Sequence, residues 1–211
     1  MLEKSLATLF ALLILATLIN RFLVWRLPER KGDEVTLRIR TWWGIVICFS
    51  MVISGPRWMT LTFFALISFL ALKEYCTLIS VHFPRWLYWV IPLNYLLIGL
   101  NCFELFLLFI PLFGFLILAT WRVFVGEPSG FLHTVSAIFC GWIMTVFALS
   151  HAAWLLMLPT TNIQGGALLV LFLLALTESN DIAQYLWGKS CGRRKVVPKV
   201  SPGKTLEGLV G

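Results

Sequence analysis

The chain has 211 residues, of which 59% are hydrophobic and only 13% are charged. An ordinary soluble domain is about 45–50% apolar, and a globule of this length still exposes about a quarter to a third of its chain surface. A soluble fold could therefore not cover so much apolar side chain. Disorder is excluded because the sequence has too little charge and too much Leu, Phe and Trp. The apolar composition therefore predicts an integral membrane protein. Its formal net charge is +7.

Seven apolar stretches are candidates for membrane-spanning helices, each of which needs about 20 mostly apolar residues. In chain order they are Ser5–Trp25, Trp42–Ser54, Met59–Ile79, Trp86–Leu100, Phe103–Trp121, Phe131–Leu158 and Gly166–Trp187. The second and fourth are short, and they cross the membrane only if they tilt or take in flanking residues. We predict an all-α, polytopic transmembrane helix bundle of about seven spans.

The positive charges alternate in step with these spans. Fourteen of the 17 Lys and Arg residues fall in residues 21–41, in the links after the third and fifth spans, or after the seventh span. They are Arg21, Arg26, Arg30, Lys31, Arg38, Arg40, Arg85, Arg122, Lys189, Arg193, Arg194, Lys195, Lys199 and Lys204. Lys73 lies within a span, Lys4 and Arg57 fall on the other side, and the link 159–166 has no charge. Because short cytoplasmic loops are enriched in Lys and Arg, we predict the N-terminus outside and a cytosolic C-terminal segment.

The last span turns polar at residues 177–181, after a long apolar run. Glu178 and Asp181 are three residues apart, and Asp181 and Tyr185 are four apart, so the three share one helix face. Carboxylate oxygens suit Mg²⁺, which is bound by few carboxylates together with water and phosphate oxygens. A helix that has merely reached the lipid headgroups would also carry carboxylates. Ile182, however, is apolar beyond Asp181, and this confinement to one face favours a functional stripe.

The segment that follows the stripe combines cations, glycines and hydroxyl groups over residues 188–208. Lys and Arg can neutralise phosphate oxygens, while Gly and Ser/Thr donors permit close approach. We infer a site for a polyphosphate carried by a metal ion, and we divide the chain into a transmembrane region, 1–176, and a phosphate-binding region, 177–211. The alternative is a topology anchor or a patch that binds anionic lipid.

The order of residues in this region is distinctive. It runs Asn180-Asp181-Ile182, Tyr185, Gly188-Lys189, Gly192, Pro198 and Ser201-Pro202-Gly203-Lys204-Thr205-Leu206-Glu207-Gly208. This order closely resembles the phosphatidate cytidylyltransferase (CDP-diacylglycerol synthase) family, whose members carry Asn-Asp-Ile/Asp-x-x-Ala-Tyr, Gly-Lys/Arg and Ser-Pro-Lys-Lys-Thr-x-Glu-Gly. The dense resemblance covers residues 180–211. Gln184 stands where the family usually has Ala, and Gly203 stands where it usually has Lys, which removes a cation.

The resemblance implies a multi-pass enzyme of the cell inner membrane that serves phospholipid biosynthesis. It would make CDP-diacylglycerol and pyrophosphate from CTP and phosphatidic acid, with Mg²⁺ as cofactor, membrane lipid as partner and no nucleic acid; a homodimer is left open. It implies Asp181 and Lys204 as catalytic residues and Asp181 with Glu178 as metal ligands. The implied substrate-binding residues are Asn180, Tyr185, Lys189, Arg193, Ser201, Thr205 and Glu207.

Family members continue to a second signature with a Lys-Asp pair, whose Asp helps to hold the metal ions. We therefore expect part of the site to lie beyond Gly211, and the 211-residue chain alone to be inactive. Three other functions stay open: a CTP-dependent lipid kinase, a transporter and a non-catalytic membrane protein that binds lipid. Transporters usually place ionisable residues near mid-membrane and show repeated halves, whereas the acidic residues here lie at one end of a span.

Overall fold

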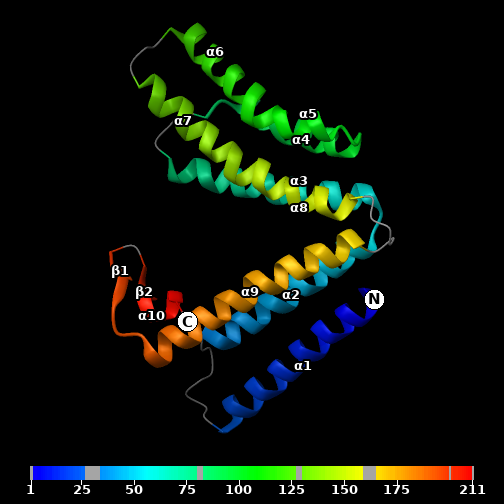
Figure 1. Ribbon diagram of the computed structural model, residues 1–211, viewed down its shortest axis with the longest axis vertical. Coiled ribbons are helices and arrows are strands. Elements are labelled where there is room, and N and C mark those ends of the chain that lie inside the picture. The colour runs from blue at the N-terminus through cyan, green and yellow to red at the C-terminus, as the bar shows by residue number, and fades with distance from the viewer. Residues whose placement is uncertain are drawn as a thin grey trace.

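The computed structural model describes residues 2–26, 34–79, 83–126, 130–158, 165–199 and 201–210. These residues are mostly helical, as predicted (Figure 1). The helices are α1 (Leu2–Arg26), α2 (Glu34–Ser54), α3 (Arg57–Leu78), α4 (Val90–Gly99), α5 (Phe103–Leu108), α6 (Phe115–Val125), α7 (Phe131–Trp142), α8 (Ala148–Met157), α9 (Gly165–Cys191) and α10 (Leu206–Val210). Two strands, β1 (Lys195–Val197) and β2 (Ser201–Thr205), lie between α9 and α10. This small hairpin is an addition to the predicted all-α fold.

Short π-helical turns join α5 to α6 and α7 to α8, so that each pair forms one continuous rod. The turns are η3 (Phe109–Gly114) and η4 (Ile143–Phe147). Pro111 lies inside η3, where its missing N–H removes one ordinary α-helical hydrogen bond. The two rods pack closely at Gly114, where an added Cβ would lie 3.4 Å from the ring of Trp142.

Six helices in the part of the chain that the structure describes are long and apolar enough to cross a membrane. They are Leu2–Arg26, Val35–Ser54, Arg57–Leu78, Phe103–Val125, Phe131–Met157 and Gly165–Cys191. The all-α polytopic bundle is thus confirmed. The second predicted span is longer than its apolar run because α2 begins at Glu34 and takes Arg38 and Arg40 into its first two turns.

The fourth predicted span, Trp86–Leu100, is not a long helix. It consists of a 3₁₀ turn, η2 (Arg85–Trp89), followed by α4. The ten residues of α4 extend about 15 Å, half of a hydrocarbon layer of about 30 Å. Pro92 explains the change of helix type, because it cannot donate the backbone hydrogen bond that a continuous α-helix needs there.

The η2–α4 segment nevertheless runs back along α3. The Tyr95 hydroxyl lies 2.8 Å from Ser68 Oγ in the middle of α3. At the start of α3, Arg57 donates a hydrogen bond of 3.0 Å to the carbonyl of Ile98 at the end of α4. The chain therefore returns to the end of the bundle at which α3 begins. The number of complete crossings stays a prediction.

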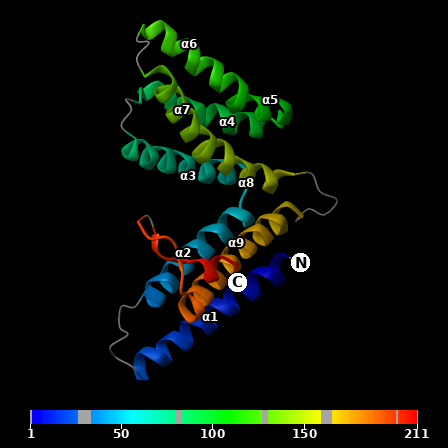
Figure 2. The ribbon, with the colours of Figure 1, turned by 60° about the vertical axis from the view of Figure 1, so that its left-hand side comes forward.

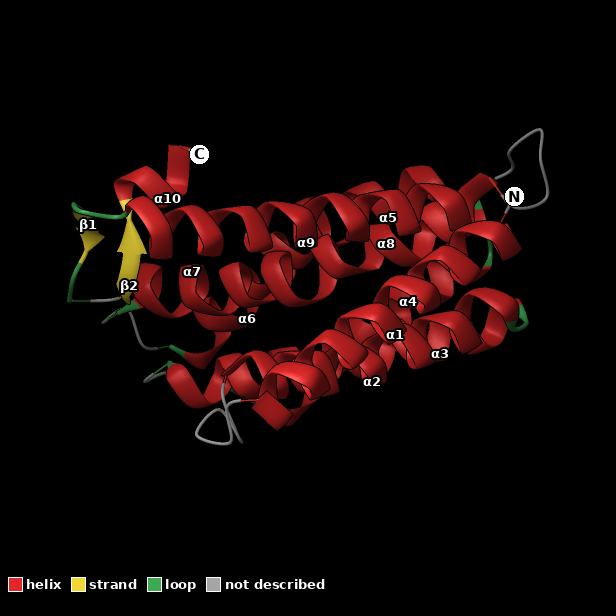
Figure 3. Cartoon of the chain, turned by 90° about the horizontal axis from the view of Figure 1, so that it is seen from below, coloured by secondary structure: helices red, strands yellow, loops and turns green. Residues whose placement is uncertain are grey.

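Positive charge collects at one end of the bundle. The end of α1, the start of α2 and the end of α9 lie at the same end as the β1–β2 hairpin (Figures 1 and 3). Of the fourteen predicted cytosolic cations, Arg30 and Lys31 lie outside the described residues, as do residues 159–164 of the uncharged link. Lys4 and Arg57 begin α1 and α3 at the opposite end. This separation agrees with the predicted topology, whose orientation across the membrane stays a prediction.

The buried core belongs mainly to α3–α8. Fully buried side chains include Leu72, Phe106, Ile110, Ile138 and Val146. Helices α1, α2 and α9 lie beside this group (Figure 2) and contribute few buried side chains. The two groups are joined where α9 begins, since an added Cβ at Gly166 would lie 2.5 Å from the carbonyl oxygen of Leu155 in α8. The looser packing of α1, α2 and α9 leaves room for cavities between them.

Candidate functional site

The polar stripe lies on the last turns of α9. The helix continues unbroken through the predicted division at residue 177 to Cys191. Glu178, Asp181 and Tyr185 line cavities that face α1 and α2. Asn180 is exposed and is absent from the lining of these cavities. Glu178, Asp181 and Tyr185 therefore share one face of α9, as the helical spacing predicted.

The chain after α9 folds back onto the end of that helix. Strands β1 and β2 pair antiparallel, with Lys195 opposite Thr205, and the N–H of Leu206 donates to the carbonyl of Arg194 at 2.8 Å. Helix α10 then packs against α9 through Gly208, where an added Cβ would lie 2.8 Å from Gly188 Cα. This contact fits glycine at both positions, and it holds the hairpin beside the end of α9 (Figure 3).

Glu207 stabilises the turn between α9 and the hairpin. Its carboxylate accepts the backbone N–H of Arg193 at 2.9 Å and that of Arg194 at 3.1 Å. These hydrogen bonds, the first of them most strongly, hold the pKa of Glu207 below its usual range, because they favour the charged form. The sequence predicted Glu207 as substrate-binding, and the structure places its carboxylate on backbone groups. We therefore treat it as a positioning residue.

Glu207→Gln is expected to loosen this turn without unfolding the bundle. The neutral amide accepts more weakly than a carboxylate, so amide exchange at Arg193 and Arg194 should become several-fold faster. In the unmodified protein the lowered pKa means that this anchoring is present at neutral pH and is lost as the pH falls through the folded-state pKa. Hydrogen exchange resolved by peptide would measure both effects. Unchanged exchange in the variant would contradict the positioning role.

A cavity of about 430 Å³ lies between the hairpin, α9 and the start of α2. Its lining includes Arg38, Asp181, Gln184, Tyr185, Ser201, Gly203, Lys204, Thr205, Gly208 and Leu209. Five of the residues that the sequence predicted for the site therefore share one cavity. Two cationic side chains, two aliphatic hydroxyls, a phenol and one carboxylate make it suitable for an anionic ligand with an accompanying metal ion.

Lys189 and Arg193 lie near this cavity but are absent from its lining. Lys189 Nζ donates a hydrogen bond of 3.3 Å to the Tyr185 hydroxyl and lies 5.5 Å from the centroid of the same ring. The side chains of both Lys189 and Arg193 are exposed. Their predicted contacts with substrate stay predictions.

Arg38 is a cavity residue that sequence reasoning assigned only to membrane topology. It stands near the start of α2, and its guanidinium carbon lies 5.0 Å from the centroid of the Tyr185 ring. Cation–π contact of this kind holds a guanidinium group over an aromatic face. Because Arg38 precedes an apolar span, the sequence predicted a cation at the level of the lipid headgroups. Nothing in the local sequence indicated that Arg38 lies close to α9.

A second, larger space adjoins the 430 Å³ cavity. This groove of about 890 Å³ runs between α1, α2 and α9 and is lined mainly by aliphatic side chains. Arg38, Asp181 and Tyr185 line both spaces. A polar cavity and an apolar groove therefore meet at these three side chains.

A model of the cytidylyltransferase family matches residues 36–211. The chain belongs to the cytidylyltransferase family. The matched region begins within the first turn of α2 and contains α3–α10 and every predicted site residue, whereas α1 precedes it. Membership of the family, together with six long apolar helices, identifies a multi-pass membrane protein related to nucleotidyltransferases.

Several proteins resemble this chain. The uncharacterized protein YnbB of Escherichia coli (strain K12) is 95% identical over 211 residues, which are 100% of this chain and 71% of that protein. The phosphatidate cytidylyltransferase of Bacillus subtilis (strain 168) is 32% identical over 48% of this chain and 36% of its own length. That of Haemophilus influenzae is 44% identical over 22% of this chain and 16% of its own length. The matches to these two enzymes thus cover well under two thirds of each enzyme. No solved structure matches the chain.

Two carboxylates on α9 have the chemistry of ligands for a divalent metal ion that a substrate would also bind. Among the described residues, no three His, Cys, Asp or Glu side chains come together as a ready-made metal cluster. Mg²⁺ is usually held by one or two carboxylates, with water and substrate phosphates as the remaining ligands. Glu178 and Asp181, on one face of α9, both line the groove, and Asp181 also lines the polar cavity. They offer this donor set, and their role as ligands stays a prediction.

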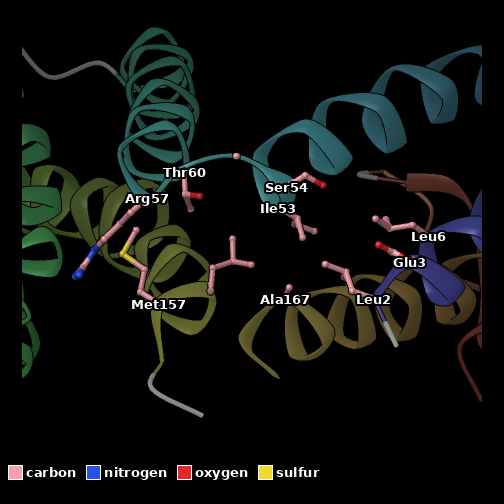
Figure 4. A pocket seen from close by; sticks show the side chains of 11 residues that line it. Leu2, Glu3, Leu6, Ile53, Ser54, Arg57, Thr60, Met157 and Ala167 are labelled. Carbon is pink, nitrogen blue, oxygen red and sulfur yellow. The ribbon is translucent and has the colours of Figure 1, made fainter. Parts of the chain in front are cut away.

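A further cavity, of about 520 Å³, lies at the opposite end of the bundle. Its ionisable lining residues are Glu3 and Arg57. The Arg57 side chain extends away from Glu3 (Figure 4) and bonds instead to Ile98 O and Asn101 Oδ1. Ser54 and Thr60 also line this cavity, but Thr60 Oγ1 donates to the carbonyl of Val52 and no lysine is among the lining residues. We therefore place the candidate site at the α9 end.

Proposed function

We propose that this protein transfers the cytidylyl group of CTP to phosphatidic acid, giving CDP-diacylglycerol and pyrophosphate. The observation that supports this proposal most directly is the junction of a polar cavity and an apolar groove at Arg38, Asp181 and Tyr185. A reaction between a water-soluble nucleotide and a membrane lipid needs two such compartments that meet at the reacting atoms. The phosphatidate cytidylyltransferase activity named for the relatives supports the same reaction.

The proposed chemistry needs no covalent intermediate on the protein. An oxygen of the phosphatidate monoester bonds to the α-phosphorus of CTP, while the bond from that phosphorus to the bridging oxygen breaks and its electron pair leaves with pyrophosphate. The second pKa of a phosphate monoester is about 6, so the attacking oxygen is already anionic at neutral pH. No general base is therefore required.

The side chains of the cavity would stabilise the charge of the nucleotide. Lys204 offers an ammonium group, and Ser201 and Thr205 offer hydroxyl donors to the phosphate oxygens. Asp181, with Glu178 beside it, would hold Mg²⁺. When bound, this ion offsets the negative charge of the phosphates and of the leaving pyrophosphate.

The position of the label in CTP tests this reaction. Full-length protein in lipid nanodiscs that contain phosphatidic acid would be given Mg²⁺ and CTP labelled in either the α- or the γ-phosphate. We expect the α-label in the lipid fraction and the γ-label in pyrophosphate. Transfer of the γ-label to lipid would indicate a CTP-dependent kinase instead. Absence of both labels from lipid, with phosphatidic acid present, would favour a transporter or a non-catalytic lipid-binding protein.

A further inference from the structure

The apolar groove has the length and the opening of a site for a single lipid chain. It extends along α9 from Leu171 to Leu186, and the part that runs from Leu171 to Asp181 covers ten residues or about 15 Å of helix. One leaflet of the hydrocarbon layer is also about 15 Å thick. Leu12 on the α1 wall and Ile182 on the α9 wall are 58% and 52% exposed, so the groove is open to surrounding lipid rather than closed within the bundle.

The polar end of the groove carries a group that suits a phosphate. Arg38 lies there with its guanidinium over the Tyr185 ring. A planar guanidinium group can donate two parallel hydrogen bonds to phosphate oxygens. An anionic headgroup at this position would have its hydrocarbon chain directed toward Leu171 and its phosphate at the edge of the 430 Å³ cavity.

Helix α1 forms one wall of the groove and is fixed to α2 by two side-chain hydrogen bonds. Trp43 Nε1 donates to Thr17 Oγ1 at 3.0 Å, and Asn20 Nδ2 donates to Thr36 Oγ1 at 3.1 Å. The region matched by the family model begins at residue 36. The α1 wall is therefore supplied by a segment that precedes the family region.

We propose that the groove between α1, α2 and α9 holds an acyl chain of a phospholipid with a monoester phosphate, and that Arg38 binds that phosphate. The phosphate oxygen of the lipid then faces the polar cavity from the side of α2. This inference rests on the proposed function for the identity of the lipid, but it makes a separate claim about where the lipid binds.

Crosslinking tests the acyl-chain site directly. Full-length protein in nanodiscs would be exposed to phosphatidic acid with a diazirine in one acyl chain, and the labelled peptides would be mapped. We expect labels on the groove faces of α1, α2 and α9, displaced by excess phosphatidic acid and much less by phosphatidylcholine. Labels spread over the outer faces of α3–α8 without enrichment in the groove would overturn the proposal.

Filling the groove from either wall should block the lipid. Ala16 on α1 and Ala175 on α9 both line it, and Ala16→Trp or Ala175→Trp should lower crosslinking about tenfold. Ala11 is exposed on α1 and is absent from the lining, so Ala11→Trp is the matched control and should change crosslinking less than twofold. Ala16→Trp and Ala175→Trp fill the groove from opposite walls, and each variant would be checked for monodispersity. If one of them fails to fold, the other still tests the site. Equal labelling of the Ala16 and Ala11 variants would contradict the site.

Substitutions of Arg38 separate headgroup binding from nucleotide binding. Arg38→Gln should reduce phosphatidate crosslinking and raise the KM for phosphatidic acid about tenfold, with a smaller effect on CTP binding. Arg38→Lys should be intermediate, because it keeps the charge and loses the planar pair of donors. A loss of CTP binding with unchanged crosslinking would assign Arg38 to the nucleotide and overturn the proposal.

The two proposals can fail independently. If crosslinks map to the groove and respond to these variants while no label passes from CTP to lipid, the lipid site stands and the proposed reaction falls. If the α-label of CTP reaches lipid while the groove is neither labelled nor sensitive to Ala16→Trp, the reaction stands and the lipid site falls.

Discussion

Asp181→Asn in the full-length protein is expected to abolish cytidylyl transfer while membrane insertion and the amount of folded protein stay unchanged. Asp181 lines both the polar cavity and the apolar groove, so its carboxylate is close to where nucleotide and lipid would meet. Asparagine keeps the size of the side chain but removes the negative charge that a divalent cation needs. We expect a fall in turnover of at least about 100-fold, as for removal of one stabilising group at a reacting centre.

Carboxylates elsewhere in the chain supply the controls for Asp181. Glu178 lines the groove but is absent from the lining of the polar cavity, so Glu178→Gln should cost less activity than Asp181→Asn. Glu104, in the first turn of α5, lies in neither lining, and Glu104→Gln should keep full turnover. CTP binding measured with and without Mg²⁺ should lose its metal dependence in the Asp181 variant. Retained turnover of labelled CTP there would refute the metal assignment.

The sequence predicted the parts of this protein that depend on local pattern. Apolar runs of about 20 residues became α1, α3 and α9 because each is long enough to cross a hydrocarbon layer. Spacings of three and four residues placed Glu178, Asp181 and Tyr185 on one face of α9. The fourth predicted span differs from the expected long α-helix because it begins with the 3₁₀ turn η2 before α4. Hydropathy does not register that Pro92 lacks a backbone donor.

The rest of the candidate site depends on contacts between distant segments. Arg38 contributes to the cavity because α2 and α9 approach each other at their charged ends, and a single sequence does not report that distance. The groove likewise exists because α1 and α2 pack together while α9 packs on α8. The close approach of Gly188 and Gly208 left one signal in the sequence, a glycine in each of the two segments, but two glycines alone do not identify each other as partners.

This glycine contact fixes the position of Ser201, Lys204 and Thr205 relative to α9. Gly208 is buried, and an added Cβ would lie 2.8 Å from the Gln184 carbonyl oxygen and from Gly188 Cα. Backbone atoms of a helix cannot rotate away as a flexible side chain would, so Gly208→Ala should push α10 off α9. Overpacking of this kind costs about 1–3 kcal/mol, which corresponds to about a 5- to 150-fold shift toward the undocked hairpin.

Gly208→Ala is therefore expected to weaken CTP binding by about tenfold or more, because Ser201, Lys204 and Thr205 would leave the cavity together. Hydrogen exchange should show faster exchange in residues 193–210 and unchanged protection in α3–α8. Gly44, exposed in α2 with no atom within 4 Å of an added Cβ, gives the matched control, and Gly44→Ala should leave CTP binding and exchange unchanged. If Gly208→Ala bound CTP as tightly as Gly44→Ala, the docked hairpin could not be what assembles the nucleotide cavity, and the placement of Lys204 beside Asp181 would lose its functional meaning.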